Sequence, residues 1–407
     1  TRTLRTTDMD ALKADLDAFG ISEEFGFVQE QQLTDLPDYY KKWLDLANNL
    51  TQLIESRELR DMVHRMPVLS PHLLTSYEEL RLAHLVLGLI TMGYVWQEKN
   101  TPVLPKTLAL PFWLVSRRLG VPPILTYADV VLYNWKFREP TGNMDIGNLD
   151  LRFPFPGGET SRWFFIVSLL VEGAAGPGIM GALMVMRAMK TFDLDGVEKG
   201  LIQVTYSLKK MKELFALMHR ESKPLVRFRG GMACFFQSYI SGASKCFRWK
   251  NSPLLPRGLL YEGVSDEPIR LSGLSAAQSS TIQCFDALLC IQHEDEAAYL
   301  KSMRDYMPPD HVQLIEALST CPSLRNFIFS RPRSDLRRVY NGCVSALVDF
   351  RNYHINTVAK YIIVPANQRC LLGGACVAQK KGSGGTNPLV FLKNVRDATE
   401  KSIQYDV

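Results

Sequence analysis

The chain has 407 residues, of which 46 % are hydrophobic and 22 % are charged. This is an ordinary composition for a soluble globular protein, and it excludes disorder over most of the length. Basic residues exceed acidic ones by 47 − 42 = 5, and the one dense basic run, residues 331–338, is interrupted by Pro332 and Asp335. A nucleic-acid site needs a basic stripe with stacking aromatic side chains, so we expect no nucleic-acid partner.

The eight cysteines all lie in the C-terminal half, and none forms a C-x-x-C pair. We therefore expect no structural zinc, and free thiols in apolar helices are typical of the cytoplasm. The longest apolar stretches are residues 82–96 and 164–171. His84 breaks the first, while Glu172 and Pro177 end the second. Both fall short of the roughly 20 apolar residues that a membrane span needs, so we expect no membrane insertion.

Hydrophobic spacing predicts an all-α protein, because the alternating runs that are typical of strands are nearly absent. In chain order, the pattern predicts helices over residues 36–59, 81–97, 127–135, 163–171, 181–191, 196–220 and 279–293, a short helix from Pro309, and helices over 335–364 and 389–403.

Two segments interrupt the helical pattern. Residues 143–160 are rich in Gly, Pro and Asn, and residues 369–388 are rich in Gly, Lys and Ser, compositions that indicate loops. We place a domain boundary in the first segment. This predicts a small helical domain over residues 1–155, a larger helical domain over residues 156–407, and a mobile loop at 369–388.

Residues 176–181 read Gly-Pro-Gly-Ile-Met-Gly and match the dinucleotide fingerprint G-x-G-x-x-G literally. That fingerprint requires a preceding strand in a βαβ unit, and none is predicted, so we interpret the run as a helix break. Residues 382–386 look like a phosphate cradle, but no helix start with a lysine follows them. We interpret them as part of a flexible lid.

His354 lies in the middle of an apolar stripe on the longest predicted helix, with Leu347, Phe350, Val358 and Tyr361 at helical spacing. Burying an imidazole there is costly unless its nitrogens are bonded. The pattern alone favours a core histidine that is hydrogen-bonded to a carbonyl. The alternative is a haem axial ligand whose apolar stripe contacts the macrocycle.

Arg351 lies one turn before His354, where a cation can pair with a haem propionate or with a buried carboxylate. Asp286, in an apolar helix, is the best such carboxylate, because buried acids are rarely left unpaired. His84 competes as a ligand, but its face of the helix offers no obvious polar partner. The adjacent Phe164 and Phe165, taken alone, indicate plain core.

Seven blocks of sequence, in the same order and across nearly the whole chain, closely resemble the indoleamine 2,3-dioxygenases. The blocks are residues 81–96, 122–129, 155–159, 275–280, 303–309, 351–354 and 382–386. The pattern is similar to that of the vertebrate members, and nearer to the second paralogue than to the first.

The resemblance implies an all-α haem protein in which a small N-terminal domain covers a larger haem-binding domain. It implies a haem b dioxygenase that uses O₂ to open the indole ring of L-tryptophan, or of a related indoleamine, to N-formylkynurenine, the first step of the kynurenine pathway. It further implies an electron donor that keeps the iron ferrous, a cytoplasmic location and a monomer.

The resemblance also assigns roles to individual positions. His354 matches the proximal iron ligand, with Asp286 and Arg351 beside it. No residue is expected to act as an acid or base. The distal substrate pocket corresponds to Tyr127, Val131, Phe164, Phe165 and Ser168; Ser275 and Ala276 match the segment over the haem that contacts both haem and substrate; Gly385 and Thr386 match the closing loop.

One segment departs from the family pattern. Family members carry an arginine that binds the substrate carboxylate, but here residues 233–248 are inserted between matching flanks. Depending on the alignment, Ala233 or Gln237 occupies the arginine's place, and neither can pair bidentately with a carboxylate. Arg227 or Arg229 can substitute only in a shifted register.

A second departure is Leu274, which stands where a smaller glycine is usual and crowds the substrate amine. The loss of a charge-assisted contact typically costs several kcal/mol of oriented binding. We therefore expect haem binding to survive and the affinity for tryptophan to be poor.

Two alternative functions remain open. One is a haem protein that binds O₂ with little or no tryptophan turnover, for which the gastropod myoglobins, similar in sequence to this family, set a precedent. The other is a signalling scaffold, since mammalian members carry tyrosine-based motifs in the small domain. Tyr39, Tyr40 and Tyr94 are the tyrosines available here.

Overall fold

The computed structural model describes residues 14–30, 35–97, 103–156, 158–220, 257–363 and 388–404. Within these ranges the fold is all-α, as predicted. Four two-residue strands complete it: β1 (Val103–Leu104) pairs with β4 (Leu260–Tyr261) in parallel, and β2 (Lys136–Phe137) pairs with β3 (Leu149–Asp150) in an antiparallel hairpin. The Gly- and Asn-rich segment that was predicted to be a loop contains the second strand of this hairpin.

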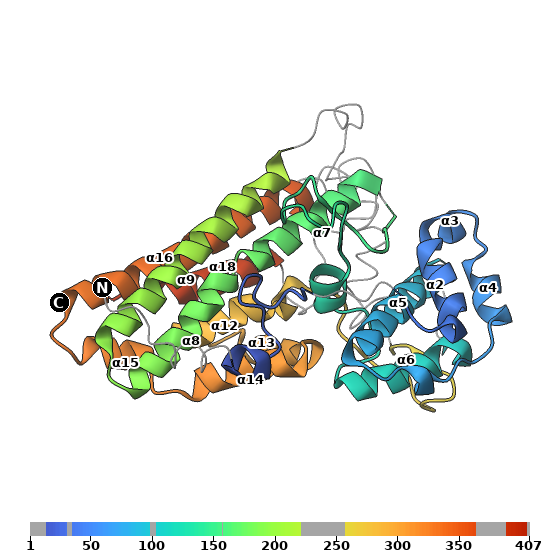
Figure 1. Ribbon diagram of the computed structural model, residues 1–407, viewed down its shortest axis with the longest axis horizontal. Coiled ribbons are helices and arrows are strands. Elements are labelled where there is room, and N and C mark those ends of the chain that lie inside the picture. The colour runs from blue at the N-terminus through green and yellow to red at the C-terminus, as the bar shows by residue number, and fades with distance from the viewer. Residues whose placement is uncertain are drawn as a thin grey trace.

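The early helices form one group in space (Figure 1). They are η1 (Asp38–Tyr40), α2 (Lys41–Asn48), α3 (Leu50–Glu55), α4 (Leu59–Arg65), η2 (Pro71–Leu73), α5 (Tyr77–Trp96) and α6 (Lys106–Leu119). The single helix predicted over residues 36–59 is wrong, because the chain turns at Asn49 and again at Arg57, whose φ is 63°. Helix α5 begins earlier than predicted because Ser76 and Glu79 form a capping box.

Helix α6 was not predicted. Pro111 lies inside it, and a proline in a helical pattern usually indicates an end or a kink. The residues that it buries include Leu108, Phe112 and Val115, so packing against α5 outweighs the hydrogen bond that Pro111 cannot donate.

The longest helices run side by side in the rest of the molecule (Figure 1), where α9 packs against α7, α8 and α16, and α16 packs against α18. Their bounds confirm the predicted helices to within a few residues: α7 (Gly158–Gly173), α8 (Gly176–Lys190), α9 (Leu194–Phe215), α16 (Ser334–Val358) and α18 (Pro388–Glu400). Shorter helices pack beside them: η4 (Ala216–His219), α12 (Ser280–Leu288), α13 (Ala297–Met303), η8 (Arg304–Tyr306), α14 (Pro309–Thr320) and α15 (Leu324–Phe329). Of these, α13, η8 and α15 were not predicted.

The glycines of the G-x-G-x-x-G run serve helix packing. The whole run lies inside α8, which begins at Gly176 and has Pro177 in its first turn, so the interpretation of the run as a helix break is wrong. A Cβ on Gly181 would lie 2.5 Å from the carbonyl oxygen of Gly200 in α9, and one on Gly178 would lie 2.8 Å from the Cβ of Ser207. Side chains at these positions would push α8 and α9 apart.

One stretch among the described residues, Ser161–Lys190, is long and apolar enough to cross a membrane by length and composition. It spans α7 and α8. Its most apolar window has a mean hydropathy of 1.6, and 83 % of that window is buried inside the protein. The stretch is therefore part of the core. Glu172 and Pro177, which were predicted to end the apolar stretch 164–171, both lie within Ser161–Lys190.

Several contacts cross the predicted domain boundary. The Phe27 ring contacts the His311 ring of α14 in a tilted arrangement with centroids 4.3 Å apart, and Asp15 pairs with Arg187 of α8 at 2.6 Å. In the other direction, the Tyr261 hydroxyl donates to the Pro123 carbonyl at 2.6 Å. The division at residue 155 stays a prediction, and these contacts join the two sides of it.

The four described cysteines, 284, 290, 321 and 343, are free. Burial raises the pKa of Cys284 and Cys343, so both thiols stay protonated at neutral pH. They act as small apolar side chains in the core, as the sequence indicated.

Candidate functional site

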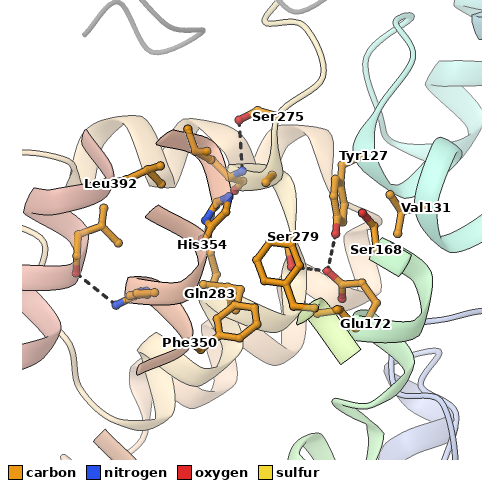
Figure 2. A pocket seen from close by; sticks show the side chains of 18 of the residues that line it. Tyr127, Val131, Ser168, Glu172, Ser275, Ser279, Gln283, Phe350, His354 and Leu392 are labelled. Atoms are coloured by element: carbon orange, nitrogen blue, oxygen red, sulfur yellow. Dashed lines mark hydrogen bonds between the residues drawn. The ribbon is translucent and has the colours of Figure 1, made fainter. Parts of the chain in front are cut away.

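A cavity of about 370 Å³ lies where α7, α9, α12, α16 and α18 meet a wide turn, the π-helix η3 (Ala128–Tyr133) (Figure 2). Its volume is typical of a small-molecule or cofactor pocket. Ten of the twelve residues predicted for the site line it: Tyr127, Val131, Phe164, Phe165, Ser168, Ser275, Ala276, Asp286, Arg351 and His354. The other two, Gly385 and Thr386, lie outside the described residues, as do residues 233–248 and residues 369–387 of the predicted loop.

His354 projects from α16 into this cavity (Figure 2). Among the described residues its imidazole has no hydrogen-bond partner, and its ring lies 5.8 Å from that of Phe215, centroid to centroid. Burial, together with the smaller effect of the nearby Arg351 charge, lowers the pKa of His354 to about 4. The imidazole is therefore neutral at pH 7, which is the form that binds metals. The carbonyl bond expected of a core histidine is not found in the described part of the chain.

Asp286 and Arg351 form the ion pair that the sequence indicated. The Arg351 Nη2 lies 2.7 Å from both carboxylate oxygens of Asp286. A third member, His293, lies 2.9 Å from Asp286 Oδ2 through its Nε2. Burial raises the pKa of Asp286, but Arg351 and His293 outweigh burial and leave that pKa below its ordinary value. The pair is consequently ionised at neutral pH.

Arg351 also ties the C-terminal helix to the cavity wall. Its Nη1 donates to the Val395 carbonyl and to the Thr399 hydroxyl, both on α18. Helix α18 contributes Phe391, Leu392 and Val395 to the lining. One buried guanidinium therefore joins α12, α16 and α18 on the side of the cavity that carries His354.

An aromatic wall forms another side of the cavity. Phe165 stacks on Phe155 with ring centroids 4.5 Å apart, and Phe164 meets Phe165 edge to face at 5.1 Å. The Ser168 hydroxyl donates to the Phe164 carbonyl at 2.9 Å, one turn earlier in α7. Flat apolar faces of this kind suit an aromatic ligand, and Ser168 is already engaged by its own helix.

The segment over the cavity is held by two glutamines. Gln278 accepts a hydrogen bond from the Tyr127 backbone N–H at 3.0 Å and donates to the Gly273 carbonyl at 3.1 Å. Gln283 donates to the Ala277 carbonyl at 3.1 Å. These bonds fix the backbone on both sides of Ser275 and Ala276, and Leu274 lies beside them in the lining with 6 % of its surface exposed.

Sequence reasoning missed Glu172, which lines the cavity with 4 % of its surface exposed. It accepts hydrogen bonds from three hydroxyl groups, those of Tyr127, Ser279 and Thr281. The available signal was a single carboxylate inside the most apolar stretch of the chain, because a buried acid needs partners.

The competing ligand His84 is a satisfied core residue. Its Nδ1 lies 3.0 Å from the Asp129 carboxylate, and its Nε2 lies 3.2 Å from the Pro122 carbonyl. The expectation that it lacks a polar partner was wrong, because Asp129 approaches from η3 in the fold. Because both imidazole nitrogens of His84 are hydrogen-bonded, neither is free to bind a metal.

The described residues fit a haem better than a bare metal ion. No group of three or more His, Cys, Asp or Glu side chains in the described ranges is placed to hold a metal. A porphyrin brings four nitrogen ligands of its own and needs one axial side chain in an apolar pocket. The unbonded His354 imidazole in an apolar cavity meets that requirement.

The fold and the cavity together define an all-α haem-binding protein. A family profile described as indoleamine 2,3-dioxygenase matches residues 15–402. The chain is 42 % identical to human indoleamine 2,3-dioxygenase 2, over 97 % of this chain and 96 % of that protein. It is 43 % identical to mouse indoleamine 2,3-dioxygenase 1, over 94 % of each. A myoglobin of Haliotis madaka is 36 % identical, over 95 % of this chain and 98 % of that protein.

The chain belongs to the indoleamine 2,3-dioxygenase family. The predicted resemblance is confirmed, and so are the all-α fold, the dioxygenase class and the haem b cofactor. The identities to a second and a first vertebrate paralogue are 42 % and 43 %, so they do not assign the chain to either.

Proposed function

We propose that this protein is a haem b dioxygenase that adds both atoms of O₂ to L-tryptophan, breaks the C2–C3 bond of the indole and releases N-formylkynurenine. The observation that carries the proposal is the His354 imidazole, which is neutral, faces an apolar cavity and has no hydrogen-bond partner among the described residues.

In this proposal His354 would hold the haem iron, and the Asp286–Arg351 pair lies on the same side of the cavity. The Arg351 charge lowers the pKa of His354 and so favours its neutral, metal-binding form. Ser275 and Ala276 cover the opposite edge, where the two glutamines hold their backbone.

The remaining walls hold the substrate. When bound, haem supplies the activation of O₂ that the reaction needs. Phe164 and Phe165 present flat apolar faces for the indole, and Tyr127 and Val131 close the far side of the pocket. The apolar lining excludes water and brings the two reactants together, which lowers the entropic part of the barrier.

No residue in the lining is assigned as an acid or base. The Ser168 hydroxyl is engaged by the Phe164 carbonyl, and the Tyr127 hydroxyl is engaged by Glu172. Ser168 therefore shapes the pocket, and Gly385 and Thr386 stay predicted members of the substrate site.

The test is the variant His354→Ala after haem reconstitution. We expect the variant to lose most of its bound haem, and to lose the spectrum of a histidine-ligated haem after reduction and addition of CO. Added imidazole should restore part of that spectrum. The matched control is His72→Ala at an exposed histidine, which should bind haem as the wild type does. A His354→Ala protein with an unchanged spectrum and haem content would overturn the assignment.

A haem protein that binds O₂ without tryptophan turnover is the second candidate. The observation in its favour is the similarity of the Haliotis madaka myoglobin over nearly the full chain. Formation of N-formylkynurenine from L-tryptophan under a reductant decides between the two. The same assay on a protein that lacks residues 233–248 tests whether this segment weakens the affinity for tryptophan.

Other expectations stay predictions. They are the monomeric state, the electron donor, the cytoplasmic location and the poor affinity for tryptophan. A scaffold role has little support, because Tyr40 and Tyr94 are 0 % and 4 % exposed and are therefore closed to a kinase in the folded protein, although Tyr39 is 40 % exposed.

A further inference from the structure

Glu172 accepts hydrogen bonds from three hydroxyl groups that come from two other parts of the fold. Its Oε1 accepts from the Tyr127 hydroxyl at 2.8 Å and from the Ser279 hydroxyl at 2.6 Å, and its Oε2 accepts from the Thr281 hydroxyl at 2.6 Å. Figure 2 shows Tyr127 pointing down to this carboxylate and Ser279 meeting it from the other side. Tyr127 precedes η3, Glu172 lies in α7, and the other two residues are at the start of α12.

Burying the Glu172 carboxylate in the protein core costs solvation free energy. An isolated carboxylate loses several kcal/mol of solvation when it is buried, unless hydrogen bonds replace the water. Two of the three bonds have the 2.5–2.7 Å length that is typical of a hydroxyl donating to an ionised oxygen. Burial raises the pKa of Glu172 above its ordinary value, and the three hydroxyls offset only part of this shift. The carboxyl group thus depends on its three donors.

Tyr127 is the only one of the three donors with a bulky side chain in the cavity wall. Its backbone N–H is held by Gln278, and its hydroxyl is held by Glu172. Burial raises the pKa of the Tyr127 hydroxyl well above its ordinary value, with Glu172 adding to the shift. The hydroxyl therefore stays protonated and can donate only in one direction, toward Glu172. The ring is consequently fixed at both ends.

We propose that Glu172 is a positioning residue that sets the Tyr127 ring in the wall facing the substrate. Glu172 acts through Tyr127, and no proton leaves either group during turnover. This inference rests on the proposed function for its kinetic meaning, since Tyr127 faces the reacting partners only if the cavity holds haem and an indole. The geometric part, the Glu172–Tyr127 coupling, does not require turnover.

The experiment is a double-mutant cycle on the haem-loaded protein with Glu172→Leu, Tyr127→Phe and the combined variant. Each single variant removes the Tyr127–Glu172 bond from one side. A hydrogen bond to a charged group is worth enough to change kcat/KM about tenfold. We expect each single variant to lose about that factor and the combined variant to be no worse than the poorer single one, because both remove the same interaction.

Two further variants separate positioning from general stability. Glu172→Gln keeps a carbonyl oxygen for Tyr127 and should recover most of the lost kcat/KM. Thr281→Val removes a hydroxyl that bonds the same carboxylate but does not line the cavity. It should lower the unfolding temperature while leaving kcat/KM within about twofold of the wild type.

The second readout is the stretching frequency of CO bound to the reduced protein, which reports the surroundings of the ligand pocket without turnover. Tyr127→Phe and Glu172→Leu should shift this band in the same direction, and Thr281→Val should not shift it. Additive losses in the combined variant would overturn the proposal. So would a Thr281→Val protein that reproduces the losses of Glu172→Leu. If the wild type turns over no tryptophan, the CO band alone decides, so failure of the proposed function is distinguished from failure of this inference.

Discussion

The guanidinium of Arg351 lies 2.7 Å from the carboxylate of Asp286, although the two residues are 65 positions apart. Both side chains are nearly buried, at 7 % and 11 % exposure. Removing one partner of a buried ion pair destabilises a protein far more than replacing both partners with apolar residues, because the remaining charge is left buried without its partner. A substitution of either Arg351 or Asp286 should therefore destabilise the cavity wall that carries His354.

Arg351→Met should lower the free energy of unfolding by about 3 kcal/mol at pH 7. The variant leaves Asp286 with His293 alone. Because the folded pKa of Asp286 lies below its ordinary 3.8, its contribution is present above that pH and is lost as the pH falls through the folded value. The difference between the two proteins should therefore shrink below about pH 4. Urea unfolding between pH 3 and 7 measures it, and a difference that grows toward low pH would contradict the assignment.

A second buried network supports the distal wall. Asp129 is 0 % exposed and accepts from Arg81 at 3.1 Å, from His84 at 3.0 Å and from the Thr126 backbone at 2.8 Å. Asp129→Ala should destabilise the protein by about 3–5 kcal/mol, because Arg81 is left buried without its carboxylate. The matched control is Glu213→Gln, whose pair with Lys210 is exposed, and it should cost less than about 0.5 kcal/mol. Equal effects in the two urea titrations would show that burial is not the cause.

The sequence predicted the parts of the site that depend on local spacing. Arg351 and His354 are one turn apart on one helix, so their common face followed from periodicity alone. Their acidic partner followed from the rarity of unpaired buried charges, and the structure confirms the ion pair. The role of each position came from the resemblance to the family, and those roles stay predictions.

The sequence did not predict features that arise from distant segments. The Glu172 cluster joins residues 45 and 109 positions apart, and no local pattern encodes such a meeting. His84 looked unpartnered because Asp129 is 45 positions away. Helix α6 was hidden by Pro111, since packing against α5 decides there and not intrinsic propensity.

The substitution Leu274→Ala tests substrate affinity, because it should lower the stability of the fold and strengthen the binding of tryptophan. The Leu274 side chain is 6 % exposed and lines the cavity beside Ser275. Leu274→Ala should lower the free energy of unfolding by about 2–3 kcal/mol because buried methyl groups are lost. The same change should lower KM for tryptophan several-fold, since a pocket change of this size is worth about 1–3 kcal/mol. Steady-state kinetics and thermal unfolding measure the two effects, and a KM that rises would refute the crowding.

Gly181 and Gly342 provide a matched pair for the close crossing of α8 and α9. A Cβ at Gly181 would lie 2.5 Å from the Gly200 carbonyl oxygen, whereas a Cβ at Gly342 in α16 meets nothing within 4 Å. Gly181→Ala should therefore destabilise the protein by about 1–3 kcal/mol through overpacking. Gly342→Ala should stabilise it by about 0.5–1 kcal/mol, because alanine loses less backbone entropy in a helix. Urea midpoints for both variants measure the contrast. A stabilised Gly181→Ala protein would mean that the two helices do not approach as closely as the backbone indicates.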